Sequence, residues 1–244
     1  QDAKVTPSML VGTKPIAAAI QSFFGANQLS AFMDQTNILA EIENKRKVTA
    51  AGPGGIVKDR ATFSIREVHN SQYAKFDPVT SPESANIGVV VQLAILARIN
   101  DFGFLEAPYR RVVKEVDNKV KSLQNRILNE EIKGVGKVGD ALTDAKIKKL
   151  TAIKSKKTVS VVPFLSEEID YLDSLDEESM YISIASVKTD ENHNMLETLV
   201  PVRHKGGFVL EDVNLVDHVD VLTYQQAGLG MALKIGRASC RERV

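Results

Sequence analysis

The spacing of apolar and polar residues predicts helices in the first part of the chain. Apolar residues recur on one face over residues 14–24, Pro15 suits the first turn, and Gly25 is expected to end this helix. A second helix is expected over residues 37–48, and a third, largely buried, over residues 86–99. The buried side chains of the second helix would be Ile38, Leu39 and Ile42.

Other patterns predict strands, turns and loops. Alternation over residues 63–69 is typical of a half-buried strand, and residues 76–85, with two prolines, should form an irregular loop. An acidic helix is expected to open at Ser166, and Lys205-Gly206-Gly207 predicts a hairpin turn. Helical periodicity runs through the Lys-rich residues 114–157, in which a glycine-rich break at residues 134–139 is followed by a second expected helix over residues 140–153. Further strands are expected at residues 158–162, 180–188 and 199–203.

These elements predict an α+β fold in which a helical region precedes a mixed, mainly β module with a basic helical insertion. The chain begins with Gln1 rather than Met, which suggests a start inside a longer protein. Its last ten residues resemble a translated sequencing adapter and include the single cysteine, Cys240. The predicted parts are a helical region at 1–110, a basic insertion or connector at 111–165, a β-rich region at 166–234 and the adapter-like tail at 235–244.

Charge is balanced overall but unevenly distributed. The formal net charge is zero, which argues against a free-standing nucleic-acid binder that is held by bulk charge. Residues 110–157 nevertheless contain 14 Lys/Arg and 6 Asp/Glu, a net +8, whereas residues 166–191 contain 1 and 9, a net −8. Two solvated faces are the simplest interpretation. No apolar run approaches the roughly 18 residues that a membrane span needs, so we expect no membrane protein.

Signatures of catalysis are scarce. The four histidines include no pair at a metal-binding spacing, and a single cysteine excludes an internal disulfide framework. No serine lies in a nucleophile-elbow context, so a hydrolase triad has little support. Neighbouring acids such as Glu167-Glu168 point to different sides of a helix, which favours a solvated face over a metal site.

The turn Gly52-Pro53-Gly54-Gly55 has cations on both sides. It lacks the Lys-Ser/Thr pair of a P-loop, and Pro53 removes one amide donor, so alone it indicates a tight turn. Lys45-Arg46-Lys47 precedes it, and Lys58 and Arg60 follow it. A turn that lets backbone approach closely, with charge beside it, suits contact with a phosphate backbone.

Longer strings of residues resemble one known family. The segment FFGANQLSAFMDQ at residues 23–35 strongly resembles the rifamycin-pocket segment of bacterial RNA polymerase β subunits, and the Gly52–Gly55 turn resembles the fork-loop signature of that family. The resemblance is dense from about Val5 to Arg110 and thinner from Ile169 to Leu233. Further matching strings are REVH at 66–69, SPE at 81–83, NIG at 86–88, FGFLEAPYR at 102–110 and VDHVDV at 216–221.

The resemblance implies part of a large α+β subunit of DNA-directed RNA polymerase, a cytoplasmic and nucleoid-associated nucleotidyltransferase. Such a part would hold the RNA–DNA hybrid and the downstream fork beside β′, α and sigma subunits, template DNA and nascent RNA. Two Mg²⁺ ions would support nucleotidyl transfer, held mainly by β′. The chain itself would need no cofactor or metal and would contain no catalytic residue.

The resemblance also assigns individual positions. Residues expected to face the RNA strand are Gln28, Lys47, Lys58, Pro82 and Asn86. Arg60 and the Gly52–Gly55 turn, with Gly54 at its tip, are expected at the downstream fork. The positions expected to line a rifamycin pocket are Leu29, Ser30, Ala31, Phe32, Asp34, Asn44, Lys47, Thr49, Ala51 and Val90.

Other interpretations stay open. The basic residues 114–157 have no close match in the common family pattern and could form a solvated helical hairpin or bind upstream DNA or a transcription factor. The whole chain could instead be an independent RNA- or DNA-binding module that uses this arm. A stand-alone nucleotide-binding enzyme has support only from the Gly52–Gly55 turn.

Departures from the family pattern predict weak or absent inhibition by rifamycins. Ala31, Asn44 and Thr49 stand where the family usually has Gln, His and Ser, and Lys47 and Lys58 replace arginines. Lysine keeps the charge but loses the planar pair of donors, and a pocket built for specific hydrogen bonds loses affinity when partners vanish. The test is to measure how strongly a rifamycin inhibits a polymerase that carries this segment. Inhibition at submicromolar concentration would contradict the prediction.

Overall fold

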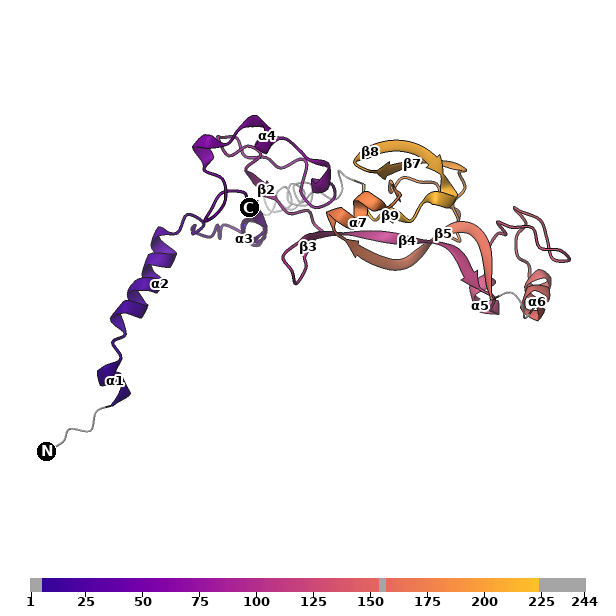
Figure 1. Cartoon of the computed structure of the whole chain (residues 1–244), viewed down its shortest axis with the longest axis horizontal. Helices are drawn as coiled ribbons and strands as arrows, with labels where there is room; N and C mark the ends of the chain where they lie inside the picture. Colours follow the sequence, from indigo (N-terminus) through magenta and orange to yellow (C-terminus); the bar gives the residue numbers. More distant parts are fainter. Residues whose placement is uncertain (1–5, 154–156, 224–244) are drawn as a thin grey trace. The chain divides into compact units, whose positions relative to one another are not determined.

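The computed structural model describes residues 6–153 and 157–223, apart from the side chains of Ser8, Met9 and Lys58 (Figure 1). The adapter-like tail, with Cys240, and the last residues of the predicted β-rich region lie outside the described residues. The described chain contains helices and mixed sheets, so the α+β prediction is confirmed. It divides into two compact units. Unit 1 comprises residues 6–67 and 81–92, and unit 2 comprises residues 68–80 and 93–223.

Unit 1 is mainly helical with one small antiparallel sheet. In this sheet β1 pairs with β2 in the register Lys47↔Gln92 to Thr49↔Val90. The elements of unit 1 are α1 (Pro7–Leu10), α2 (Lys14–Ala26), α3 (Ile38–Lys45), β1 (Lys47–Thr49), η1 (Lys58–Arg60), α4 (Phe63–Arg66) and β2 (Val90–Gln92).

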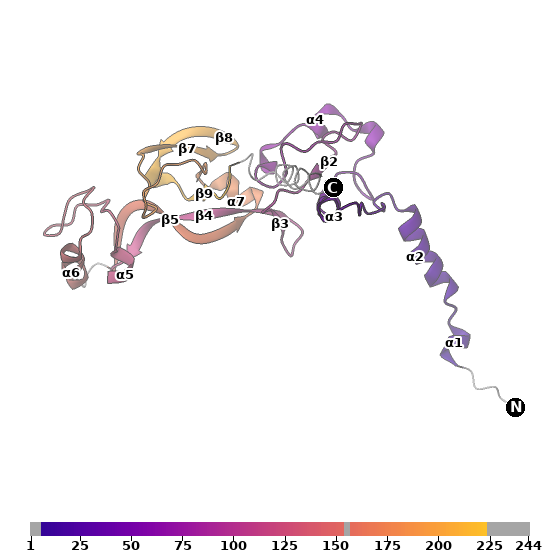
Figure 2. The ribbon, with the colours of Figure 1, turned by 180° about the vertical axis from the view of Figure 1, so that it is seen from behind.

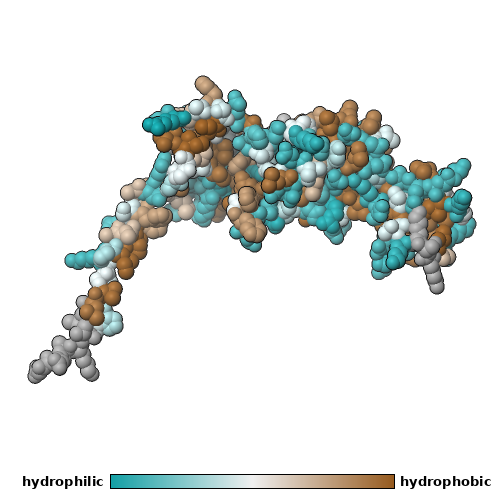
Figure 3. Space-filling model, in the orientation of Figure 1, coloured by the Kyte–Doolittle hydropathy of each residue, from teal (hydrophilic) through white to brown (hydrophobic). Residues whose placement is uncertain are grey.

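The first two predicted helices are present, but the second ends at Lys45, before β1, and the expected burial of Ile38 and Ile42 is wrong. Helix α2 continues through Gly25 to Ala26, and α3 begins after Asn37, whose side chain accepts a hydrogen bond from the Ala40 amide at 2.7 Å. Ile38 and Ile42 of α3 are 78% and 41% exposed. Figure 3 shows apolar side chains along α2 as well. These helices therefore have amphipathic faces that unit 1 does not cover.

Two other predictions for this region are wrong. Residues 63–69 contain the short helix α4 instead of a strand, and Phe63 is 87% exposed. Residues 86–99 do not form a helix, because a turn with Gly88 at φ +72° precedes β2 and the chain then passes to β3 (Arg98–Ile99). The expected loop over residues 76–85 is irregular, as predicted.

Unit 2 is built on a seven-stranded sheet in the order β3-β4-β9-β6-β7-β8, with β5 also paired to β4. The β6–β9 pairing is parallel, and the other pairings are antiparallel. Besides β3, its elements are η2 (Asn70–Gln72), β4 (Leu105–Asp117), α5 (Val120–Leu123), α6 (Asp144–Ala152), β5 (Thr158–Leu172), α7 (Ser174–Ser179), β6 (Ile182–Ser183), β7 (Leu199–His204), β8 (Gly207–Asp212), η3 (Val213–Leu215) and β9 (His218–Asp220).

Long strands replace part of the predicted helical insertion. Figures 1 and 2 show β4 and β5 side by side, and the predicted boundary at residue 110 falls inside β4. The periodicity before the glycine-rich break yields only the four-residue α5, whereas the helix expected after it is confirmed as α6. No helix opens at Ser166, because β5 continues to Leu172 and the acidic helix α7 begins after Asp173.

The predicted hairpin turn is confirmed. Lys205 and Gly206 have φ values of +48° and +74°, and they join β7 to β8 in the register His204↔Gly207. Positive φ at both positions suits the right-handed twist of the paired strands. The strand expected at 199–203 is β7, whereas the one expected at 180–188 is reduced to β6.

A buried group of charged side chains holds unit 2 together. Glu177 of α7 is 3% exposed and accepts hydrogen bonds from Lys75 and, at 3.0 Å, from Arg203 of β7. The Arg203 guanidinium also donates to the Tyr109 hydroxyl of β4 at 3.0 Å. Burial lowers the pKa of the Lys75 ammonium from its ordinary 10.5, against the charge of Glu177. One carboxylate thus links three separate parts of the unit.

Asp220 of β9 is the second buried carboxylate of this region. It is 6% exposed and accepts a hydrogen bond from the Tyr73 hydroxyl at 2.8 Å, while the Arg203 guanidinium lies 4.2 Å from the centre of the Tyr73 ring. Burial raises the pKa of the Asp220 carboxyl to about 6, although the Tyr73 hydrogen bond and the Arg203 charge oppose the change. Asp220 is therefore poorly solvated as an anion.

We predict that Glu177→Gln destabilises the chain by about 3–5 kcal/mol, because it leaves the buried Lys75 and Arg203 without their shared carboxylate. Glu178→Gln on the same helix is the matched control, since Glu178 is exposed and should cost less than about 0.5 kcal/mol. Urea unfolding of both variants measures the difference. Equal losses in the free energy of unfolding would show that the Glu177 carboxylate does not stabilise the fold through Lys75 and Arg203.

We also predict that Asp220 makes stability fall as the pH rises from about 4 to about 6. The folded state holds the Asp220 proton up to its pKa of about 6, whereas the unfolded state releases it near the ordinary 3.8. Relative to Asp220→Asn, the wild-type free energy of unfolding should drop by about 3 kcal/mol across this window and then level off. Denaturant titrations at several pH values test this, and parallel profiles for the two proteins would refute it.

Candidate nucleic-acid interface

The Gly52–Gly55 turn forms a tight, solvent-exposed bend at the end of β1. The Gly55 amide donates to the Gly52 carbonyl and the Ile56 amide donates to the Ala50 carbonyl, both at 2.9 Å. A β-carbon at Gly55 would collide with the Ala50 carbonyl, and Gly54 has φ +77°. Glycine is therefore required to close the bend, and its tip leaves backbone open to solvent.

A second segment of unit 1 lies beside this bend. The Ala50 amide donates to the Val89 carbonyl at 3.0 Å, which extends the β1–β2 pairing towards the bend. The Arg66 guanidinium donates to the carbonyls of Ala85 and Ile87 at 2.6 and 2.7 Å. The loop with Pro82 and Asn86, both half-buried, is thereby fixed next to the glycine bend.

The segment before α3 contacts the bend from another direction. A β-carbon at Gly52 would lie 3.1 Å from a Leu29 methyl group, so Leu29 packs on the bend. Asn27 accepts a hydrogen bond from the Leu29 amide at 2.9 Å, and the Ser30 hydroxyl donates to the Phe24 carbonyl at 2.6 Å. Gln28 is exposed within this segment.

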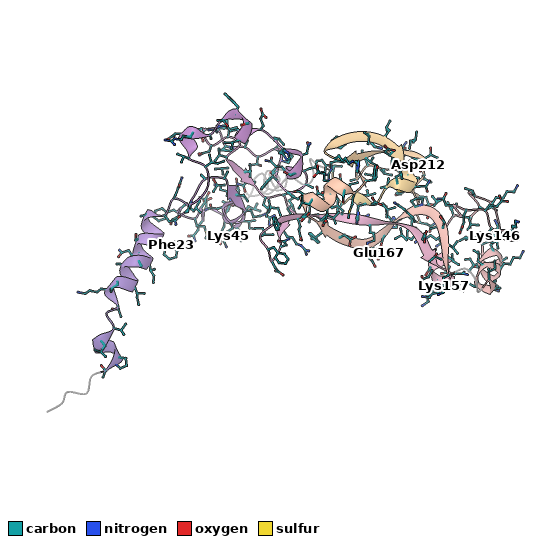
Figure 4. The ribbon with its side chains drawn as sticks, in the orientation of Figure 1. Phe23, Lys45, Lys146, Lys157, Glu167 and Asp212 are labelled. Carbon is teal, nitrogen blue, oxygen red and sulfur yellow. The ribbon has the colours of Figure 1, made fainter. Side chains whose placement is uncertain are left out.

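The cations near the bend differ in their surroundings. Lys45, labelled in Figure 4, pairs with Glu41 one helical turn away at 2.7 Å. Lys47 and Arg60 are exposed and form no ion pair with any residue that the structure describes. The Lys58 side chain lies outside the described atoms, although its backbone belongs to η1. Lys47 and Arg60 are thus available to an anionic partner.

The structure brings together only part of the residue set predicted from the sequence. Lys47 of β1, Gly54 of the bend and Asn86, whose carbonyl accepts from the Val89 amide, belong to one hydrogen-bonded assembly. Pro82 lies in the loop before Asn86, and Arg60 precedes Ala61, whose carbonyl accepts from Arg66 at 3.4 Å. Among the rifamycin positions, Leu29, Thr49, Ala51 and Val90 adjoin the bend or β2. The other rifamycin positions have fewer contacts with the bend and β2. Phe32 is fully exposed, the Asp34 side chain accepts from the Thr36 amide, and the Asn44 amide donates to the Phe32 carbonyl at 3.5 Å. The remaining two positions are Ser30 and Ala31.

Sequence reasoning missed the residues that position this site. Arg66 joins residues about twenty positions away, and no local pattern marks an arginine for carbonyl contacts at that separation. A β-carbon at Gly88 would collide with the backbone of Arg66. The resemblance had matched Arg66 and Gly88 as parts of short strings without giving them a role.

The described parts of the chain contain no group of three or more His, Cys, Asp or Glu side chains placed to hold a metal ion. No helix among them is long and apolar enough to cross a membrane. Unit 2 has a mostly apolar hollow of about 490 Å³ between its η2 region and β7–β8, with Arg203 and Asp220 in its wall. Those two side chains already serve the buried polar group described above.

Comparison with known proteins identifies the family. Residues 31–99 match the family model "RNA polymerase Rpb2, domain 3", and residues 153–221 match "RNA polymerase beta subunit external 1 domain". The chain is 40% identical over 221 residues to the DNA-directed RNA polymerase subunit beta of Dehalococcoides mccartyi, which covers 89% of this chain and 17% of the relative.

Two further relatives agree. The same subunit of Chloroflexus aggregans is 34% identical over 275 residues, with 95% of this chain and 22% of the relative covered. That of Solibacter usitatus is 37% identical over 228 residues, with 93% and 15% covered. The chain thus spans less than a quarter of the length of these relatives, and it belongs to the family of bacterial DNA-directed RNA polymerase β subunits.

Proposed function

We propose that this chain serves DNA-templated RNA synthesis as part of a polymerase β subunit, in which unit 1 contacts the RNA–DNA hybrid and the downstream fork. The observation that carries the proposal is the open glycine bend, flanked in sequence by Lys47 and Arg60, neither of which pairs with an acid among the described residues. Cations and exposed backbone contact phosphates without reading bases. Such contacts suit an enzyme that must move along any template.

The role of these residues is to bind and position nucleic acid rather than to perform the chemistry. Nucleotidyl transfer would take place at Mg²⁺ ions held mainly by the β′ subunit, with α and sigma subunits completing the enzyme. Template DNA and nascent RNA are the proposed partners of the bend, and the nucleoid of the cytoplasm is the proposed place of action.

Uncovered apolar surface supports membership of a larger assembly. On α2, Ile16, Ile20 and the neighbouring Phe23 and Phe24 are 54–68% exposed, and Phe23 is labelled in Figure 4. Apolar residues on one face of a helix normally pack against another element. These faces would be covered by other parts of the polymerase.

We predict that Lys47→Gln lowers the affinity of the polymerase for the RNA–DNA hybrid, because it removes a positive charge that no acid among the described residues balances. Losing one phosphate contact should lower the slope of log affinity against log salt concentration by about 0.7–0.9. The affinity itself should fall by no more than about tenfold. Dissociation of halted elongation complexes at several salt concentrations measures both quantities.

Lys45→Gln is the matched control for this test. Lys45 lies two residues away, but Glu41 already balances its charge, so a smaller change in slope is expected. If the slope of log affinity against log salt concentration falls equally in the two variants, or does not fall in Lys47→Gln, the bend does not bind nucleic acid as proposed.

A further inference from the structure

The described residues 118–153 and 157, here called the basic module, form a compact structure at one end of the β4–β5 ribbon. The ribbon ends in the pair Asp117↔Thr158, and the Asn118 side chain donates to the Leu150 carbonyl at 2.9 Å. The module and the adjoining ribbon share a core of Val116, Leu123, Leu128, Ile132, Leu142, Ile147, Leu150, Val159, Val161 and Phe164. Its backbone is therefore held by a packed core, unlike that of a basic tail.

The module presents several lysines that lie outside its ion pairs. Six exposed lysines have no ion pair with the described residues, namely Lys121, Lys133, Lys137, Lys148, Lys149 and Lys157. Several acids are already engaged. Asp140 pairs with Lys146 at 2.8 Å, Asp117 pairs with Lys119 at 2.6 Å, and Glu130 accepts from the Ser160 amide at 2.9 Å. Figure 4 labels Lys146 and Lys157 in this module.

Packing of α6 directs two of these lysines outward. Ile147 and Leu150 are 2% and 0% exposed, so the helix turns this face to the core. Lys148 and Lys149 lie between them in sequence and are exposed on the other side. The positive face is thus a consequence of the same packing that builds the module.

The composition of the module indicates which anionic partner it fits. Residues 118–157 contain no Phe, Tyr, Trp or His, so no ring is available to stack on the bases of a single strand. Its one arginine, Arg126, lies 3.4 Å above the Phe164 ring and donates to the Asn192 carbonyl at 2.9 Å. The module therefore lacks the aromatic and arginine anchors of a typical protein interface. Lysine ammonium groups bind phosphates as point charges and neutralise a phosphate backbone without reading its sequence.

We propose that the basic module binds the phosphate backbone of duplex DNA without sequence preference. This inference rests on the proposed function, because the polymerase supplies the DNA, but it concerns a surface separate from the glycine bend. The module would strengthen the hold on duplex DNA and would leave the extension of RNA unchanged.

The test uses RNA polymerase assembled with a full-length β subunit that carries this chain. Lys148→Gln/Lys149→Gln removes two module charges and keeps residues of similar helix propensity. On a scaffold with long duplex arms, the slope of log affinity against log salt concentration should fall by up to about 1.8. RNA extension on a scaffold with minimal duplex arms should match that of the wild type.

The control is Lys188→Gln/Lys205→Gln, which removes two exposed lysines of unit 2 outside the module. It should leave the slope unchanged. The proposal is overturned if the module variant keeps the wild-type slope or if the slope of the control falls by as much as that of the module variant. It is also overturned if the module variant loses RNA extension on the minimal scaffold as strongly as it loses affinity for the long duplex arms. Failure of the proposed function is seen separately, as an unchanged slope in Lys47→Gln.

Discussion

The antiparallel pairing of β4 with β5 is the interaction on which unit 2 depends. These strands pair from Ala107↔Leu172 to Asp117↔Thr158, with register shifts near Arg110 and Val113. Across the ribbon, Arg111 donates two hydrogen bonds to Asp170 at 2.6 and 2.7 Å, and together with His218 it holds the pKa of the Asp170 carboxyl at about 2. Tyr109 of β4 reaches the buried charged group, and the opposite end of the ribbon carries the basic module. The paired strands β4 and β5 thus connect the buried charged group around Glu177 to the exposed lysines of the basic module.

The sequence predicted the elements whose signals are local. Helix α2, helix α6 and the turn at Lys205-Gly206 each depend on spacing or on a backbone conformation that neighbouring residues specify. Residues 86–99 were mistaken for a helix because a short apolar run fits a buried helix and a strand equally well. Only the pairing of Val90 with Thr49, forty-one positions earlier, decides the outcome, and spacing within one segment cannot show it.

The candidate site was predictable to a similar extent. The glycine bend and the flanking cations follow from the sequence. The family resemblance predicted that they contact nucleic acid, whereas the relatives support only that the chain belongs to the β-subunit family. The sequence could not show that Glu41 balances Lys45 while Lys47 has no acidic partner among the described residues, because two lysines in one basic run look alike. It also could not show that Arg66 positions the loop with Asn86, since the partners are carbonyl groups, which every residue has.

A net charge of zero is compatible with two separate surfaces for nucleic acid. At physiological salt, charges farther apart than about 8 Å are largely screened, so a phosphate responds to the nearest side chains rather than to the whole chain. The acids that balance the total are concentrated in residues 166–191, where Asp170 and Glu177 are committed to partners within unit 2. Carboxylates used in this way stabilise the fold and leave the lysines of the basic module to act locally. The charge distribution, rather than its sum, therefore determines where an anionic partner can bind.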